Sequence, residues 1–189
     1  VSATAEVLRR NLAGNEACLN IEEMALSSSS GTAKIYISGE KNAGTNSLHD
    51  DSHGQKKPAI INLTSAADFC ALRDIPHVHL LKCDTEGHDM EVIRGALSLL
   101  KEERISVLQF EYNHRWAFSG NFLRDVFVTI EFLPYKLVKL QGDSLLVFEK
   151  WHPELDKFFE GNYGLVHNDS MSWFPTKSAE FDKFNVLLV

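Results

Sequence analysis

The chain has 189 residues, of which 44% are hydrophobic and 24% are charged, so it is long enough to bury the core of one globular domain. Its net charge of −7 and scattered Lys and Arg argue against a nucleic-acid partner, because phosphate contacts need clustered cations. No apolar run reaches membrane-spanning length, no signal peptide is visible, and Cys18, Cys70 and Cys83 form no CxxC pair. We therefore expect a cytoplasmic protein with buried thiols, without a membrane segment, a metal site or a disulfide framework.

The first part of the sequence predicts a helix, two strands, a long loop, and then another strand and helix. Ser2 is a good cap for the opening helix, and the run of four serines before Gly31 favours a turn. The polar loop is long enough to suggest a function, although a plain surface loop is an equal alternative. In chain order, the predicted elements are a helix over 2–12, strands over 17–26 and 33–38, the loop over 39–57, a strand over 58–63 and a helix capped by Thr64 that ends near 73.

The second part begins with a near-continuous apolar strand over 77–83, which is typical of a strand covered on both faces. After Gly87, apolar residues from Ile93 to Leu100 fall at i, i+3, i+4 and i+7, which predicts one helix with an apolar stripe. The remaining predicted elements are a strand over 105–111, a helix over 121–130, a hairpin of strands 135–140 and 144–148, a short helix over 153–160, a strand over 162–167 and a polar tail over 168–189 that wraps the surface.

Strands and helices alternate through the middle of the chain. This alternation predicts right-handed βαβ crossovers, and hence an α/β fold with a mostly parallel sheet and helices on both faces. Ligands of such sheets bind at the carboxyl ends of the strands. We therefore look for chemistry where strands end.

Two strand ends carry unusual polar residues. The strand over 77–83 runs into Asp84 and Glu86, followed by Gly87, and the strand over 105–111 ends in Glu111 and leads to His114. Acidic residues at a helix start can simply cap it, and the second segment can be a solvated loop. Because adjacent strands lie about 4.8 Å apart, the two ends can also share one cleft.

Other chemical motifs are weak or absent. His77 and His79 form an HxH pair, but they lie at the amino end of their strand, far from Asp84, so we interpret them as surface or hydrogen-bonded histidines. The sequence has no GxGxxG, P-loop, GxSxG or HExxH motif. The residues alone are compatible with a site for a nucleotide-type ligand, a hydrolase or a binding module.

Residues 80–96, LLKCDTEGHDMEVIRGA, resemble the signature of the FkbM-type methyltransferases. The matching positions are Lys82, Asp84, Glu86, Gly87, Glu91, Gly95 and Ala96, and one departure is the His88-Asp89 pair, where small or acidic residues are usual. Flanking segments over 23–31, 46–48, 107–111 and 162–163 agree in order and spacing. The resemblance covers about residues 5–167.

The resemblance implies a class I methyltransferase fold, which is a Rossmann-like, seven-stranded sheet that binds S-adenosylmethionine (SAM) over its carboxyl edge. Asp84 is then expected beside the methionine end of SAM, with Gly87 in the cofactor site, and Ala25, Leu26 and Ser27 near the adenine. The glycine-rich loop and the ribose-binding acid of the family are expected before Val1. Residues 1–167 are then the methyltransferase domain, and 168–189 the tail.

The implied reaction is O-methylation of a hydroxyl on a sugar or polyketide-like small molecule. An alcohol loses its proton as the new bond forms, so Asp84, Glu86 and His114 are candidate catalytic residues. One alternative is a non-catalytic Rossmann-like module that binds a partner through the 39–57 loop. Another is a metal-dependent hydrolase that uses the same three residues.

Overall fold

A computed structural model describes residues 2–14, 19–37, 46–48 and 57–189. The predicted loop over 39–57 therefore lies almost entirely outside the described residues, as does Cys18. The helices are α1 (Ser2–Asn11), α2 (Ala66–Leu72), α3 (Asp89–Gly95), α4 (Leu97–Lys101) and α5 (Leu123–Ile130), with 3-10 helices η3 (His114–Ser119), η4 (Pro153–Asp156) and η5 (Asn168–Trp173). The strands are β1 (Met24–Leu26), β2 (Gly31–Ile37), β3 (Lys57–Thr64), β4 (Val78–Lys82), β5 (Ile105–Tyr112), β6 (Tyr135–Gln141), β7 (Ser144–Phe148), β8 (Gly161–His167), β9 (Thr176–Ser178), β10 (Glu180–Phe181) and β11 (Leu187–Leu188).

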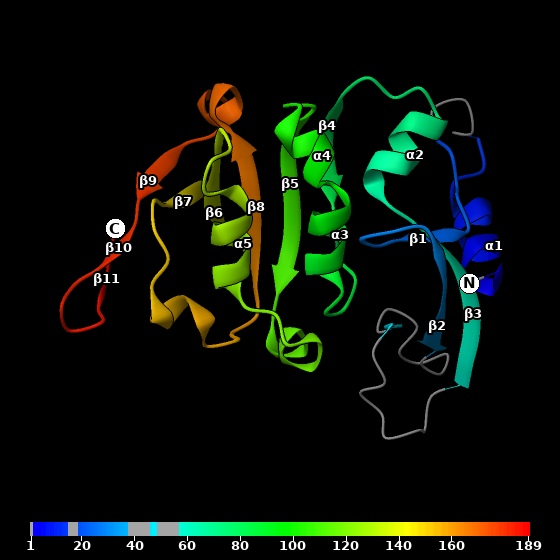
Figure 1. The fold of residues 1–189 in the computed structure, drawn as a ribbon, viewed down its shortest axis with the longest axis horizontal. Coiled ribbons are helices and arrows are strands. Elements are labelled where there is room, and N and C mark those ends of the chain that lie inside the picture. Colours follow the sequence, from blue (N-terminus) through cyan, green and yellow to red (C-terminus); the bar gives the residue numbers. More distant parts are fainter. Residues whose placement is uncertain (1, 15–18, 38–45, 49–56) are drawn as a thin grey trace.

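The strands form separate sheets rather than one seven-stranded sheet (Figure 1). A three-stranded sheet has the order β1-β3-β2, and a six-stranded sheet has the order β4-β5-β8-β6-β7-β9. β10 and β11 form a small hairpin near the C-terminus. The molecule is a mixed α/β protein, as expected for a Rossmann-like methyltransferase, but its sheet is divided.

The prediction of a mostly parallel sheet is wrong for the six-stranded sheet. β4 and β5 are parallel, whereas β5–β8, β6–β8 and β6–β7 are antiparallel. The predicted β6–β7 hairpin is confirmed, and its two-residue turn at Gly142 and Asp143 forces antiparallel pairing. The tail contributes β9, which pairs in parallel with β7.

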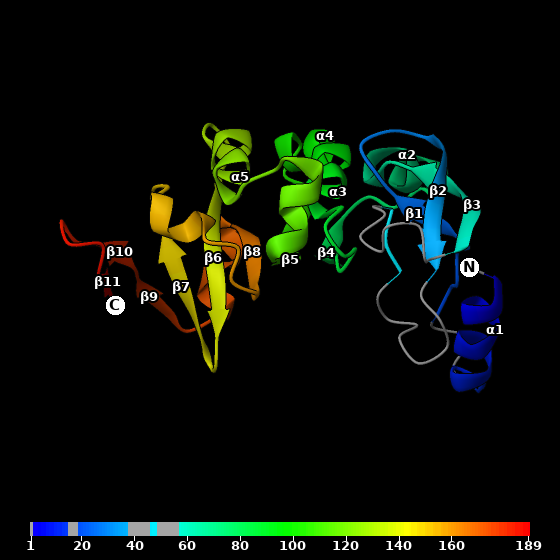
Figure 2. The ribbon, with the colours of Figure 1, turned by 90° about the horizontal axis from the view of Figure 1, so that it is seen from below.

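The α-helices that pack on the six-stranded sheet lie on one of its faces, not on both as predicted, and of the described helices only the short 3-10 helix η5 contacts the opposite face (Figure 2). Figure 2 shows α3, α4 and α5 on the same side of this sheet. There they cover a core that includes Leu108, Phe110 and Leu165. The opposite face carries a smaller cluster around Val138 and Val166, with Phe174 packed against it.

β4 is an edge strand and is not covered on both faces. Among the described residues it pairs only with β5, and Leu80 on it is 58% exposed. The predicted helix after Gly87 is divided at Ala96 into α3 and α4. No helix in the described part of the chain has both the length and the apolar character that a bilayer crossing requires.

Two predicted boundaries near the N-terminus also shift. Of the strand predicted over 17–26, the described residues 19–26 form a strand only at Met24–Leu26, where the backbone pairs with Asn62–Thr64 of β3. Thr64 is the last residue of β3, so the cap of α2 is Ser65, whose Oγ accepts from the Asp68 N–H at 2.9 Å.

Candidate functional site

The carboxyl ends of β4 and β5 lie side by side, as predicted from the sequence. Lys82 is paired with Gln109, and the Cys83 N–H donates to the Gln109 carbonyl at 2.7 Å. The segments that follow, 84–88 and 111–115, therefore leave the sheet at the same edge. This edge is where ligands of α/β sheets bind.

The loop after β4 is held in an unusual backbone conformation. Glu86 has φ +55° and Gly87 has φ +97°, both in the left-handed region. A Cβ on Gly87 would lie 2.8 Å from the Arg115 Cβ, so only glycine fits there. Hydroxyls of Ser47 and Ser119 donate to the carbonyls of Glu86 (2.9 Å) and Gly87 (3.3 Å). The loop is thus fixed by contacts from two other segments.

The two predicted acids of this loop occupy different environments. The Glu86 side chain is only 13% exposed and forms an ion pair with Arg115 at 2.7 Å. The Asp84 side chain is 54% exposed and pairs with Lys82 at 3.0 Å. Glu86 therefore anchors η3 to the loop, whereas Asp84 faces the solvent at the sheet edge.

Glu111 is the third carboxylate at this edge. Burial raises its pKa, and so does repulsion from Asp84, Glu160 and Glu86. The Asn113 side chain is buried, and its amide donates to Glu111 Oε2 at 2.7 Å. We call Asp84, Glu86, Glu111 and Glu160 the acidic edge. Lys82 and Arg115 offset two of these four negative charges, and the net negative charge that remains favours a positively charged ligand.

A fully buried carboxyl lies at the start of α3. Asp89 is 0% exposed, and burial raises its pKa, an effect that the nearby Thr85 hydroxyl only partly offsets. Burial, with Asp89 nearby, also raises the pKa of the Cys83 thiol, so this cysteine is not a nucleophile. Cys70 and Cys83 are both free and buried, as predicted.

The end of β1 is brought against this loop. Ser27 Oγ and His88 Nε2 are hydrogen-bonded at 3.0 Å, and a Cβ on Gly95 would lie 2.0 Å from the Ser27 carbonyl oxygen. Of the predicted cofactor residues, Ser27 therefore lies beside the segment of Gly87 and Asp84. Ala25 and Leu26 are half-buried in β1.

An apolar groove of about 300 Å³ lies between β1 and β4. Met24 and Leu26 line it from β1, and Val78 and Leu81 line it from β4. Each of these strands has one edge that pairs with no strand of the described residues.

The predicted histidines have separate positions. His114 is exposed at the start of η3, which is capped by the Asn113 side chain through the Arg115 N–H at 2.9 Å. His77 is hydrogen-bonded to Ser106 at 2.8 Å. Within the described residues, no group of three His, Cys, Asp or Glu side chains is arranged to hold a metal ion, so Asp84, Glu86 and His114 do not form such a group.

The sequence alone did not predict the roles of three residues that contribute to the site. Asn113 orients Glu111, Arg115 holds Glu86, and Asp89 is buried beneath the loop. Asn113 and Arg115 flank the predicted His114, so the sequence indicated the correct segment but not these two residues. The pairing of Arg115 with Glu86 joins residues from two strand ends, and no local pattern indicates it.

Comparison with known protein families matches residues 3–138 to the methyltransferase FkbM domain. Comparisons with curated proteins and with solved structures gave no significant match. The matched residues include both strand ends of the acidic edge, the buried Asp89 and the end of β1. Since the match spans most of the sequence, the chain belongs to the FkbM methyltransferase family.

Proposed function

We propose that this protein is a SAM-dependent methyltransferase that methylates a hydroxyl oxygen of a small molecule, in a reducing compartment such as the cytoplasm. The observation that supports it most is the acidic edge. Burial raises the pKa of Glu111 there, and repulsion from the neighbouring carboxylates raises it further. A sulfonium cofactor carries the positive charge that such an edge favours. Family membership supports the methyl transfer, and the charge supports the donor.

The negative charge of the acidic edge is complementary to the positive sulfonium of SAM. We propose that Asp84 lies beside the methionine end of SAM, while Gly87 and Ser27 form the adjoining wall, with Ala25 and Leu26 toward the adenine. When bound, SAM supplies a methyl group activated by its sulfonium. The carboxylates serve cofactor binding more than rate, because the sulfonium charge fades toward the transition state.

We also propose that a further strand, carrying a glycine-rich loop, completes the cofactor site at the open edge of β4. The apolar groove between β1 and β4, and the unpaired outer edge of β4 among the described residues, support this proposal. Such a strand would hydrogen-bond to a parallel neighbour and bury Val78 and Leu81.

Among the candidate bases, Glu111 and Asp84 are better placed than Glu86. Glu86 is neutralised by Arg115, whereas the raised pKa of Glu111 makes its carboxylate a stronger base than an ordinary one. His114, exposed at the start of η3, remains a third candidate. We propose that one of these accepts the proton of a sugar or polyketide-like hydroxyl.

Isothermal titration calorimetry of the protein with SAM tests the proposal. We expect a dissociation constant below about 1 mM and weaker binding for Asp84→Asn, with Glu180→Gln, on the distant β10, as the matched control. Transfer of radiolabelled methyl from SAM to a panel of sugars and polyketide-type alcohols identifies the acceptor. Absence of SAM binding to a folded protein that includes the completing strand would contradict the proposal and favour a binding module.

A further inference from the structure

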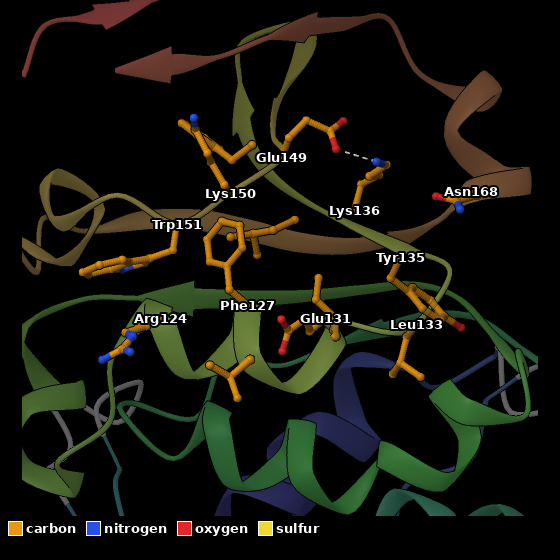
Figure 3. Close-up of a pocket in the computed structure, with 14 residues that line it drawn as sticks. Arg124, Phe127, Glu131, Leu133, Tyr135, Lys136, Glu149, Lys150, Trp151 and Asn168 are labelled. Carbon is orange, nitrogen blue, oxygen red and sulfur yellow. Dashed lines mark hydrogen bonds and ion pairs between the residues drawn. The ribbon is translucent and has the colours of Figure 1, made fainter. Parts of the chain in front are cut away.

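A second, larger groove lies away from the acidic edge, between α5 and strands β6 and β7 (Figure 3). Its volume of about 450 Å³ is in the range of small-molecule sites. The floor is apolar and is formed by the buried side chains of Ile130, Leu137 and Phe148. In Figure 3, the Phe127 ring points from α5 into the groove, and Trp151 closes one end.

The Trp151 ring is fixed in place. Its Nε1–H donates to Asp156 Oδ2 at 2.6 Å, and Asp156 Oδ1 accepts from the Leu123 N–H at 2.6 Å and the Tyr112 hydroxyl at 2.9 Å. This carboxylate therefore joins η4, the start of α5 and the end of β5. A ring held in this way is a preorganised surface, so a ligand that packs on it loses little conformational entropy of the protein.

The Trp151 end of the groove carries positive charge. The Arg124 guanidinium lies over the Trp151 ring, 5.4 Å from its centroid, and Lys150 precedes Trp151 in the chain. Neither cation forms an ion pair with a carboxylate of the described residues, whereas Lys136 on the opposite wall is paired with Glu149 at 2.5 Å. The remaining acid of the lining, Glu131, lies one helical turn beyond Phe127.

We propose that this groove, which we call the basic groove (Arg124, Phe127, Lys150 and Trp151), binds an anionic small molecule with a flat apolar ring. The ring packs on Phe127 and the apolar floor, and the carboxylate, sulfonate or phosphate group pairs with Arg124, which lies beside the Trp151 ring. A guanidinium already stacked on an aromatic face keeps its N–H donors available for a planar anion. The site is separate from the acidic edge, and its ligand has the opposite charge.

The test uses two probes of similar shape, the anionic 8-anilinonaphthalene-1-sulfonate and the neutral N-phenyl-1-naphthylamine. The chain has three tryptophans: Trp116 is buried in the core, Trp173 lies beside an apolar groove on the opposite face of the sheet, and Trp151 lines the basic groove. Indole N–H signals in ¹H–¹⁵N spectra therefore report where a probe binds. A Trp173→Phe variant, at a half-exposed position, assigns one of the three signals.

We expect the anionic probe to shift the Trp151 signal and to bind more tightly than the neutral one. Arg124→Gln should lower the affinity for the anionic probe by about tenfold, the effect of one charge-assisted hydrogen bond, and leave the neutral probe unchanged. Lys101→Gln, an exposed cation on α4, is the matched control. A shift of the Trp173 signal alone, equal binding of the two probes, or an affinity that Arg124→Gln does not change would overturn the proposal.

Discussion

The acidic edge and the basic groove have opposite charge within a chain whose net charge is −7. At the acidic edge, Asp84 and Glu111 come from neighbouring strand ends and repel each other, while the basic groove holds two cations, Arg124 and Lys150, without carboxylate partners among the described residues. The difference teaches that local placement, rather than total charge, sets the ligand that a region favours. It also shows that the acidic edge depends on close packing, because contacts from Ser47, Arg115 and Ser119 hold the loop that carries Asp84 and Glu86.

The largest expected effect comes from separating α3 from the end of β1. Ser27, at the end of β1, contacts His88 directly after the loop of the acidic edge and lies against Gly95 in α3. Gly95→Ala would place a Cβ 2.0 Å from the Ser27 carbonyl oxygen, so backbone must move, and we expect a loss of about 3 kcal/mol of unfolding free energy. Chemical denaturation measures this loss. Gly31→Ala is the control, because no atom lies within 4 Å of the added Cβ there; equal losses for both variants would contradict the close packing of α3.

Glu86→Ala and Asp84→Ala separate the two acids of the loop. Glu86 is mostly buried with Arg115, so its removal should cost about 2 kcal/mol of stability, less than for a fully buried pair. Asp84 is exposed, and losing its pair with Lys82 should cost less than about 0.5 kcal/mol. Urea unfolding of both variants tests this order, and a larger loss for Asp84→Ala would show that the assignment of anchor and solvent-facing acid is reversed.

A smaller effect than that of Glu86→Ala, and of opposite sign, concerns the buried Asp89. Because burial raises its pKa in the folded state, the folded protein binds this proton more tightly than the unfolded chain does. The contribution of Asp89 to stability is therefore highest when it is protonated in both states, and it declines as the pH rises from the ordinary pKa of an Asp to the raised pKa. Asp89→Asn should remove this decline and stabilise the protein at pH 7 by about 1 kcal/mol.

Thermal melts between pH 5 and pH 8 compare the two proteins. The wild type should lose stability relative to Asp89→Asn as the pH rises. Parallel pH profiles would mean that Asp89 stays ionised in the folded protein, with hydrogen bonds that compensate for its burial.

The sequence was sufficient to predict most elements from β4 onward, because apolar periodicity and turn residues are local signals. It predicted the adjacent ends of β4 and β5, and the family motif from Lys82 to Ala96 is enough to locate the candidate site. The antiparallel position of β8 between β5 and β6 could not be predicted, since strand order depends on contacts between residues far apart in the chain. The exposure of β4 could not be predicted for the same reason. Leu80 looks like a core residue in the sequence, but its burial depends on which strands and helices lie beside it.

Within the site, the identity of the polar residues was easier to predict than their exposure, their ion pairs and their pKa shifts. Asp84 and Glu86 stand two positions apart and look alike in sequence, yet Arg115 neutralises one and solvent surrounds the other. Glu111 lies at the predicted strand end, but its raised pKa arises from burial and from charges on other segments. The basic groove had no motif at all, because its cations come from α5 and from the segment after β7.

The central claim is that the acidic edge binds the positive charge of SAM. Its most direct test is calorimetry at pH 8 with SAM and with S-adenosylhomocysteine, which lacks the sulfonium charge, for the wild type, Glu111→Gln and the control Glu180→Gln. We predict that Glu111→Gln reduces the affinity for SAM relative to S-adenosylhomocysteine by about fivefold, while Glu180→Gln leaves this ratio unchanged. The same ratio should fall in the wild type as the pH is lowered through the raised pKa of Glu111. A ratio that is identical in all three proteins and at every pH would contradict the claim.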